Sequence, residues 1–373
     1  MPKTVRHIPG AVGFVLTLSM LVASCGTDDD AVPESSATAI EAGTATEASP
    51  TPLHVEILPW PGTLEVVLDR GYLLCGSRDD LPGFAFAQPD GTHAGFDVDM
   101  CRVVAAAVLG DADAVEIVPV TSAERFVALA AGLFDVMNRN STWTATRDGN
   151  EGATFPFIYY YDGQGMMVPA SSGFTTLEDL ADANICVSTG TTTELNLTAV
   201  FAARGIPFNP VTFEGFDTLV PAYEAGQCEA MTSDTSGLGV FKYEIEIRGG
   251  PEQHIMAEVF SKEPLGPVVR DGDTQWAQIV NWAIMATVQA WEFGLDSTNI
   301  ASYDGNDPNI LNFLGRDGFD PGLGLPSDFA VQVISQVGNY EEIFSRHPQL
   351  GTLAGSANDL WTNGGLMYVP PYR

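Results

Sequence analysis

An arginine beside a run of hydroxyl side chains has the clearest chemical meaning in this sequence. Residues 138–148 read NRNSTWTATRD, which puts Arg147 close to Thr142 and Thr144. A guanidinium combined with hydroxyl and backbone N–H groups can hold a carboxylate or a phosphate. The same residues also occur in solvated loops. Because this stretch follows a short predicted strand, it can face a cleft at the strand's carboxyl end. We assign Arg139 only a structural or rim role.

A second candidate anion site lies where another predicted strand runs into a helix. Residues 188–194 read STGTTTE, so Gly190, Thr191 and Thr192 would form the N-terminus of that helix. Free N–H groups and the helix dipole attract an anion at such a position. The alternative is a threonine cap that serves only its own helix.

Three further residues can complete a ligand pocket. Asp234, in the stretch TSDTSG (232–237), ends a predicted strand and can receive an ammonium group, or it can cap the next helix. Phe84 and Phe96 flank the first predicted strand and helix and can wall a pocket, although core packing is the usual role of such rings.

Short apolar runs alternate with helical patterns along the chain, which indicates an α/β fold with a largely parallel sheet. Thr121 and Glu124 have the spacing of a capping box ahead of a further helix. The pattern occurs twice, so we expect two lobes joined by crossings near 159–168 and 263–273, with a ligand cleft between them. The predicted strands are 70–76, 114–120, 134–137, 183–190, 208–213 and 228–234, and the predicted helices are 97–110, 191–205, 217–226 and 274–294. The predicted lobes are 59–165 plus 268–373, with a C-terminal extension, and 166–267, including the return crossover.

The N-terminus has the features of an exported lipoprotein. Two basic residues precede an apolar run that is too short to span a membrane stably, and this run ends in LVASC at Cys25. The ending resembles the bacterial lipobox, whose cysteine carries the lipid; a plain secretory signal is the alternative. We therefore predict a signal peptide at 1–24 and a lipidated Cys25 followed by a disordered tether to residue 58.

Four cysteines remain once Cys25 is assigned to the lipid. An even number in an exported protein favours disulfides, each worth about 3–4 kcal/mol at these loop lengths. Three connectivities are possible, and four buried thiols are the alternative. The most local connectivity joins Cys75 to Cys101 and Cys186 to Cys228.

Composition excludes several classes of function. The chain has 373 residues and a formal charge of −32, which argues against nucleic acid as a partner. The five histidines are scattered, and no HExxH, CxxC, P-loop or GxSxG motif occurs, so no metal, cofactor or hydrolase chemistry is indicated. We expect no enzyme activity and no cofactor.

Taken together, these segments resemble the amino-acid-binding proteins of ABC importers. DVMNRNSTWTATR (135–147) fits the family's pattern of an aspartate-headed strand followed by Ser-x-Thr-x-x-Arg. CVSTGTTTELNL, SKEPLGPVVRDGD and GNYEEIF are similar to further family segments and occur in the same order. The resemblance runs from about residue 63 to the C-terminus and is greatest to the general L-amino-acid-binding branch. It implies the two-lobed type II periplasmic binding-protein fold.

The resemblance also implies ligand roles and partners. The ligand's α-carboxylate would bind Arg147, N–H groups near Thr142 and Thr144, and the helix start at Thr191 and Thr192. Asp234 would hold the α-ammonium. The expected partners are a free L-amino acid, an importer permease and, through the lipid, a membrane, with the protein monomeric and exported. The loop GSRDDLPGF places Arg78 and Leu81 where many relatives have an acidic and a ring-bearing residue, so the ligand's side chain stays unassigned.

An enzyme of the same fold is the alternative function. Dehydratases of the cyclohexadienyl or arogenate type share this architecture, and fold alone does not exclude catalysis. Such an enzyme needs a general acid in the cleft, whereas Arg147 and Asp234 are better explained as ion-pair partners of a ligand.

Overall fold

The computed structural model describes residues 62–372. The predicted signal peptide, the lipidated Cys25 and the tether therefore lie outside the described residues. Within 62–372, no helix has the length and apolar character needed to cross a membrane.

The first of two large sheets carries the N-terminal part of the fold. Its strand β1 runs parallel to both neighbours, and its strand β14 is antiparallel to every strand that it pairs with. The strands, in spatial order, are β5 (Val115–Pro119), β1 (Leu73–Ser77), β6 (Val136–Thr142), β14 (Glu263–Arg270) and β7 (Ala153–Thr154), with β8 (Tyr160–Asp162) also paired to β14. The predicted parallel strands at 70–76, 114–120 and 134–137 are confirmed.

The second sheet repeats this plan, as the internal similarity of the sequence predicted. Strand β10 is parallel to β11 and β12, and strand β9 runs antiparallel to β12 and β13. The order is β11 (Asn209–Phe213), β10 (Asn184–Ser188), β12 (Ala230–Asp234), β9 (Gln164–Pro169) and β13 (Gln253–Ile255). A third, smaller sheet contains β2 (Asp80–Leu81), β3 (Ala85–Ala87) and β4 (His93–Ala94).

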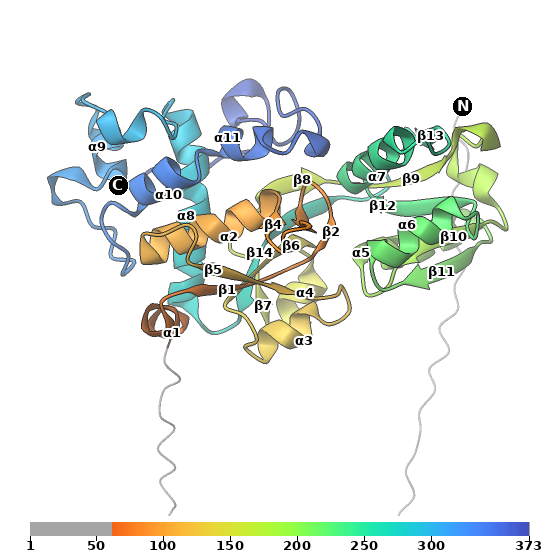
Figure 1. Ribbon diagram of the computed structural model, residues 1–373, viewed down its shortest axis with the longest axis horizontal. Coiled ribbons are helices and arrows are strands. Elements are labelled where there is room, and N and C mark those ends of the chain that lie inside the picture. The colour runs from red at the N-terminus through yellow and green to blue at the C-terminus, as the bar shows by residue number, and fades with distance from the viewer. Residues whose placement is uncertain (1–61, 373) are drawn as a thin grey trace, which may run out of the picture. The chain divides into compact units, whose positions relative to one another are not determined.

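The chain passes between the two large sheets along two neighbouring segments (Figure 1). Strand β8 leads into β9, and the return strand β14 pairs with β8 through Glu263 and Asp162. From Glu263 onward the return strand belongs to the first sheet, whereas we expected residues 263–267 in the second lobe. The hydrogen bonding explains the difference, because Leu265 and Gly266 pair with the end of β6.

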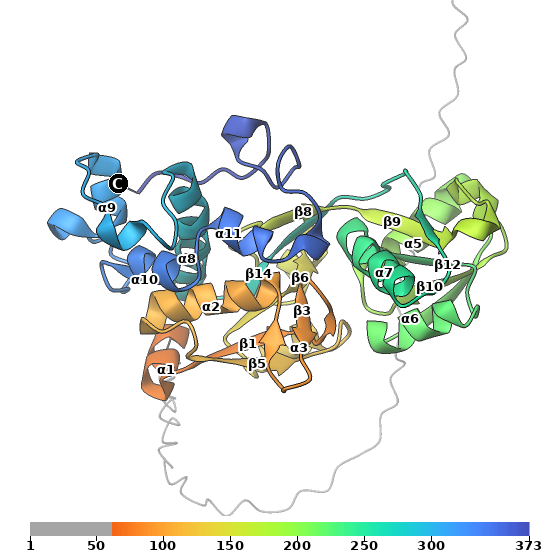
Figure 2. The same ribbon diagram turned by 45° about the horizontal axis from the view of Figure 1, so that its top comes forward.

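Helices cover both large sheets (Figures 1 and 2). Those that accompany the first sheet are α1 (Thr63–Arg70), α2 (Phe96–Leu109), α3 (Arg125–Ala130), α4 (Ala145–Asn150), α8 (Thr274–Glu292), α9 (Pro308–Phe313), α10 (Phe329–Gln336) and α11 (Tyr340–Ser345). Those of the second are α5 (Thr192–Arg204), α6 (Phe216–Glu224) and α7 (Thr235–Ile247). Short 3₁₀ turns are η1 (Ala170–Ser172), η2 (Leu177–Leu180), η3 (Ile300–Ser302), η4 (Arg316–Gly318), η5 (Pro348–Leu350) and η6 (Trp361–Asn363).

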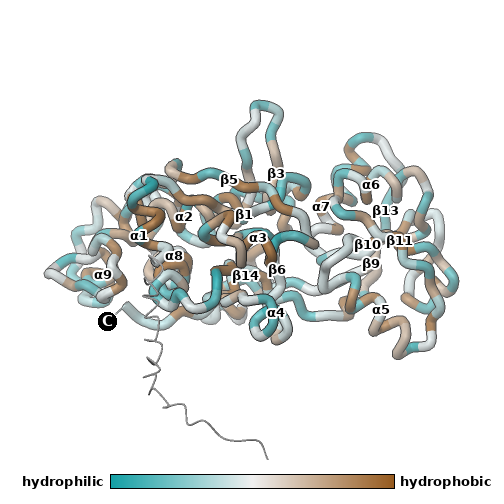
Figure 3. The backbone as a smooth tube through the Cα atoms, turned by 90° about the horizontal axis from the view of Figure 1, so that it is seen from below, coloured by the Kyte–Doolittle hydropathy of each residue, from teal (hydrophilic) through white to brown (hydrophobic). Residues whose placement is uncertain are grey.

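The predicted helices are stabilised because their apolar residues pack against neighbouring helices and strands. Helix α2 is buried over most of its length and packs on α8 and α10, and its hydrophobic colouring contrasts with the hydrophilic α4 (Figure 3). Burying one large aliphatic side chain contributes about 1.5–3 kcal/mol, so these interfaces hold the first lobe together. Only half of the predicted capping box forms: Glu124 N donates to Thr121 Oγ1 over 3.3 Å, whereas the Glu124 carboxylate accepts from Thr121 Oγ1 over 2.8 Å and not from the Thr121 backbone. This turn precedes α3, which begins at Arg125.

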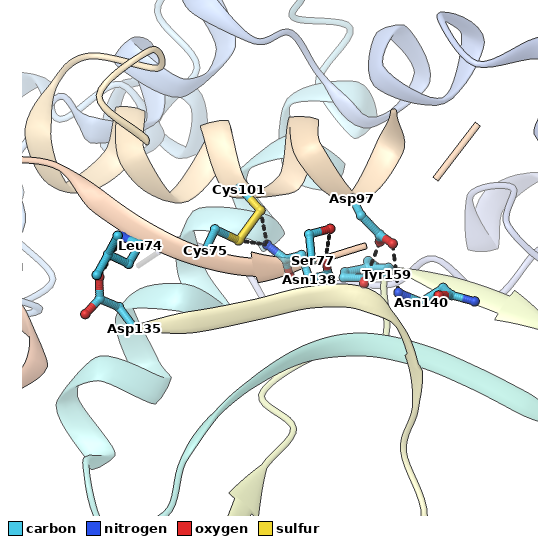
Figure 4. Close-up of a disulfide and its surroundings, with 9 residues drawn as sticks. All are labelled: Leu74, Cys75, Ser77, Asp97, Cys101, Asp135, Asn138, Asn140 and Tyr159. Atoms are coloured by element: carbon cyan, nitrogen blue, oxygen red, sulfur yellow. Dashed lines mark hydrogen bonds between the residues drawn. A yellow bond between two sulfur atoms is a disulfide. The ribbon is translucent and has the colours of Figure 1, made fainter. Parts of the chain in front are cut away.

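Both disulfides adopt the most local of the three possible connectivities. Cys75 in β1 is bonded to Cys101 in α2, and Cys186 in β10 is bonded to Cys228, which precedes β12. Figure 4 shows the Nδ2 group of Asn138 directed at both sulfurs of the first disulfide, 3.8 and 3.6 Å away. Each bridge ties an inner strand of a sheet, β1 or β10, to a segment further along the chain.

Replacing Cys186 and Cys228 by alanine is expected to lower the free energy of unfolding by about 3–4 kcal/mol, because the unfolded chain loses the constraint on a long loop. The bridge spans 42 residues of sequence. Urea unfolding of the oxidised protein and the double variant measures the difference. The matched Cys75 and Cys101 variant opens a loop of 26 residues and should lose slightly less. An unchanged unfolding midpoint in both variants would contradict the structural role of the bridges.

Candidate ligand-binding site

A small polar cavity lies at the carboxyl ends of the central strands of both large sheets. Its volume is about 40 Å³. The first-lobe lining residues are Arg78, Ser122, Arg125, Arg139, Asn140, Thr142 and Arg147, and the second-lobe residues are Ser188, Thr191, Thr192, Thr193, Phe216, Thr232, Ser233 and Asp234. This edge of an α/β sheet is where ligands of such folds bind.

Arg147 is held in this cavity by the start of helix α4. Thr144 caps the helix, accepting a hydrogen bond from Arg147 N over 3.2 Å. The guanidinium donates from Nη1 to the carbonyl of Thr142 over 2.7 Å and lies 5.2 Å from the centre of the Phe126 ring. Burial lowers the pKa of Arg147. No carboxylate of residues 62–372 lies within 4.0 Å of it, so its other N–H groups can receive a ligand carboxylate.

Helix α5 directs its N-terminus at the same cavity. Thr191 is the N-cap, accepting from Glu194 N over 3.1 Å and donating to Ser188 O over 2.6 Å. The N–H groups of Thr192 and Thr193, which both line the cavity, belong to the first helical turn and lack intrahelical partners. Ser188 Oγ is buried and has no hydrogen-bond partner among the described residues. These groups are donors suited to an anion.

Asp234 faces the cavity from the end of β12. It precedes helix α7 as the N-cap, but its side chain makes no capping hydrogen bond, so it does not serve the helix in the way that the alternative interpretation assumed. Burial raises the pKa of Asp234 well above its ordinary value, and the nearby carboxylates of Asp162 and Glu263 raise it further. A ligand ammonium would offset this unfavourable environment.

The two lobes touch beside the cavity. Gly190 has φ of +68°, and a Cβ there would lie 3.0 Å from the Cα of Ala123 in the other lobe, so a side chain would both strain the backbone and push the lobes apart. Arg125 Nη2 donates to Gly190 O over 3.4 Å, and Phe216 N donates to Asp80 Oδ2 over 2.7 Å. The structure is therefore a closed one. Gly190 and Thr144 line an adjoining outer cavity, not the central one.

Phe84 and Phe96 do not wall the cavity, which corrects the sequence interpretation. Both rings are fully buried in the first lobe's core. Their centroids are 6.3 Å apart, in an edge-to-face arrangement. The same aromatic cluster includes Tyr159, Tyr160, Tyr340 and Phe344. The C-terminal segment supplies the last two of these rings and so draws Phe96 into the core. Phe216 of the second lobe lines the cavity instead, under the guanidinium of Arg78 at 4.5 Å.

Glu263, which sequence reasoning missed, joins the two lobes next to the cavity. Its Oε2 accepts from Thr142 Oγ1 over 2.6 Å and from Thr192 Oγ1 over 2.8 Å, and its Oε1 accepts from Asn196 Nδ2 over 2.8 Å. Thr142 belongs to the first lobe, whereas Thr192 and Asn196 belong to helix α5 of the second. One buried carboxylate on the return strand therefore receives donors from both sides.

Three further arginines line the cavity: Arg78, Arg125 and Arg139. From the sequence we assigned neither Arg78 nor Arg139 to the ligand, and we did not single out Arg125. Arg139 is 4% exposed, and its Nε donates to Val120 O over 2.8 Å, so it is not the rim residue that we allowed for. Arg78 donates to Asp80 Oδ1 over 2.6 Å and to Asn140 Oδ1 over 3.1 Å. Behind this wall, burial raises the pKa of Asp97 to about 6, and Asp97 accepts from Tyr159 and Asn140 (Figure 4).

Comparison with known proteins agrees with this geometry. The sequence model of bacterial extracellular solute-binding proteins, family 3, matches residues 73–292. The General L-amino acid-binding periplasmic protein AapJ of Rhizobium johnstonii is 43% identical over 320 residues, covering 83% of this chain and 93% of AapJ. The Glutamate/glutamine/aspartate/asparagine-binding protein BztA of Rhodobacter capsulatus is 44% identical over 318 residues, with the same coverages.

Solved structures have the same architecture. A periplasmic binding protein of Brucella ovis with glutathione bound superposes with a TM-score of 0.79 at 39% identity, covering 84% of this chain and all of that one. The fold is therefore the two-lobed type II periplasmic binding-protein fold, and the named relatives are binding proteins, not enzymes. With a match over most of its α/β core and relatives aligned along nine tenths of their length, the chain belongs to family 3 of the bacterial extracellular solute-binding proteins.

Proposed function

We propose that this protein captures a free L-amino acid between its lobes and delivers it to the permease of an ABC importer. One observation carries the proposal: a buried guanidinium and a buried carboxylate, Arg147 and Asp234, line one small cavity from opposite lobes. An amino acid offers the complementary pair, a carboxylate and an ammonium on the same carbon. The relatives' names, which include amino-acid-binding components of transporters, support this ligand class and this partner.

The proposed binding cycle uses closure of the lobes. The ligand's α-carboxylate is received by Arg147 and the N-terminus of helix α5, and its α-ammonium by Asp234. Since these groups come from different lobes, only the closed form holds both ends of the ligand, and binding shifts the population toward closure. The closed surface is then what the permease recognises.

The same cavity argues against the dehydratase alternative. The acids at its edge already have partners, since Asp162 accepts from Gly163 N over 2.8 Å and Glu263 accepts from two threonines and an asparagine. This leaves Asp234, whose position opposite Arg147 suits a counter-ion. A calorimetric panel of free L-amino acids on ligand-stripped protein tests the choice. Binding of none of them, together with turnover of prephenate or arogenate, would overturn the receptor proposal.

The finer points of location complete the proposal. We infer that Cys25 carries a lipid that anchors the monomeric protein outside the cytoplasmic membrane, because the residues before it resemble a lipobox. The position outside the cytoplasm agrees with the extracellular family and with two disulfides in the fold. Mass spectrometry of the exported protein would show the lipid on the new N-terminal cysteine, and an unmodified Cys25 would exclude the anchor.

Replacing Arg147 by alanine is expected to weaken every amino-acid ligand by a similar factor, at least about tenfold, because a charged hydrogen bond of about 1.5–3 kcal/mol to the shared carboxylate is lost. Calorimetry with several amino acids measures the change. Arg204 is a matched control, since it lies on the surface of the second lobe and pairs there with Glu258. If Arg147→Ala bound its ligands unchanged, Arg147 would not be the carboxylate site.

Replacing Glu263 by glutamine is expected to lower the affinity for all ligands in parallel without changing their order of preference. The reason is that Glu263 touches both lobes but does not line the cavity, so it stabilises closure and makes no direct contact with the ligand. Loss of its charged acceptor should raise each Kd about tenfold or more. Small-angle scattering with saturating ligand would show whether the variant still closes. Unchanged affinities would contradict this role.

A further inference from the structure

The cavity contains more positive charge than the head group of an amino acid requires. Four guanidiniums line it, from Arg78, Arg125, Arg139 and Arg147, against the single lining carboxylate of Asp234. In the proposed function Arg147 and Asp234 are matched by the ligand's own carboxylate and ammonium. Three arginines therefore remain to be explained.

Arg78 is neutralised within the protein. Its Nε donates to Asp80 over 2.6 Å. Burial raises the pKa of Asp80, but the charge of Arg78 and this hydrogen bond outweigh burial and hold the pKa at about 2. The Arg78–Asp80 pair is thus complete without a ligand. Its guanidinium stacks on Phe216, which fixes it in the wall.

Arg125 and Arg139 have no such partner. Neither has a carboxylate within 4.0 Å among residues 62–372, although they are only 3% and 4% exposed. Burial and the positive charges of Arg147, Arg139 and Arg78 lower the pKa of Arg125 well below its usual value. Burial and Arg78 likewise lower the pKa of Arg139 to about 9, although the charges of Asp80 and Asp97 oppose this shift. Buried charges without a directly bonded partner are costly, and an anion in the cavity would supply one.

The hydrogen bonds distinguish the two residues. Arg125 uses Nη1 on Ser122 O and Nη2 on Gly190 O, so its end groups already hold the backbone of both lobes. Arg139 uses only Nε, on Val120 O, and its two Nη groups have no partner in the described part of the chain. A guanidinium with both Nη groups available can bind a carboxylate with two parallel hydrogen bonds.

Resting on the proposed function, we propose that the cavity selects acidic amino acids, glutamate or aspartate, and that Arg139 binds their side-chain carboxylate. Such a ligand has an ammonium for Asp234, an α-carboxylate for Arg147 and a second carboxylate for Arg139. Arg125 adds positive charge beside the second carboxylate and joins the closed lobes. A dicarboxylate without an amino group would leave Asp234 unpaired. A neutral amino acid would leave Arg139 unpaired.

The first experiment compares acids with their amides, which have nearly the same shape, on the intact ligand-stripped protein. Calorimetry at pH 7 is expected to give glutamate at least a tenfold lower Kd than glutamine, and aspartate the same advantage over asparagine. Glutathione, in which the glutamate side-chain carboxyl is an amide, should bind more weakly than glutamate. An amide or glutathione that binds as tightly as the free acid would overturn the inference, and this comparison requires no variant.

The second experiment changes Arg139. In Arg139→Gln the ratio of the glutamine Kd to the glutamate Kd should fall to near one, whereas Arg139→Lys should keep part of it. Arg204→Gln, on the surface, should leave the ratio unchanged. A ratio in Arg139→Gln equal to that of the natural protein would exclude Arg139. If neutral amino acids bind as tightly as glutamate and their binding depends on Arg147, the selectivity for acidic amino acids is excluded but the proposed function stands. If no amino acid binds, both the selectivity and the proposed function are excluded.

Discussion

Buried charges without protein partners are the constraint on which the rest of this structure depends. Arg147 and Asp234 come from different lobes, are 6% and 7% exposed, and have no oppositely charged partner within 4.0 Å in residues 62–372. Burying such a charged group within one lobe costs free energy, because the charged form loses its contacts with water and gains no partner in exchange. A ligand with complementary charges removes the cost only when both lobes surround it. In the proposed function, affinity and closure are therefore coupled, because the same two buried charges require both a ligand and a closed cavity.

The topology supplies the geometry that this requirement needs. Parallel strands place their carboxyl ends at one edge, so β6, β10 and β12 deliver Thr142, Ser188 and Asp234 to one place. The return strand adds Glu263, which accepts hydrogen bonds from both lobes. The Cys75–Cys101 disulfide and the packing of α2 on α8 and α10 hold the first lobe together. In the proposed binding cycle, we therefore assign the motion of closure to the two crossing segments.

Local patterns predicted the head-group site but not the whole pocket. The positions of Arg147 and Asp234 were predictable because Asp234 ends a strand and Arg147 lies shortly after one, and strand ends are visible in sequence. The position of Arg139 was not predictable from the sequence. In a regular strand, successive side chains point to opposite faces of the sheet, but Asn140 has φ of 35° and interrupts this alternation. Arg139 and Asn140 therefore both face the cavity. Phe96 was misplaced because Tyr340 and Phe344, far along the chain, enclose it.

In the proposed complex, opposite lobes bind the two ends of an amino-acid head group. Calorimetric titration of ligand-stripped protein with glutamate, N-acetylglutamate and glutamate α-amide tests it directly, because each derivative removes the charge from one end only. The account predicts that both derivatives bind at least about tenfold more weakly than glutamate, in line with the loss of one charged contact. A derivative that binds as tightly as glutamate would show that its end of the head group is not held, and would contradict the account.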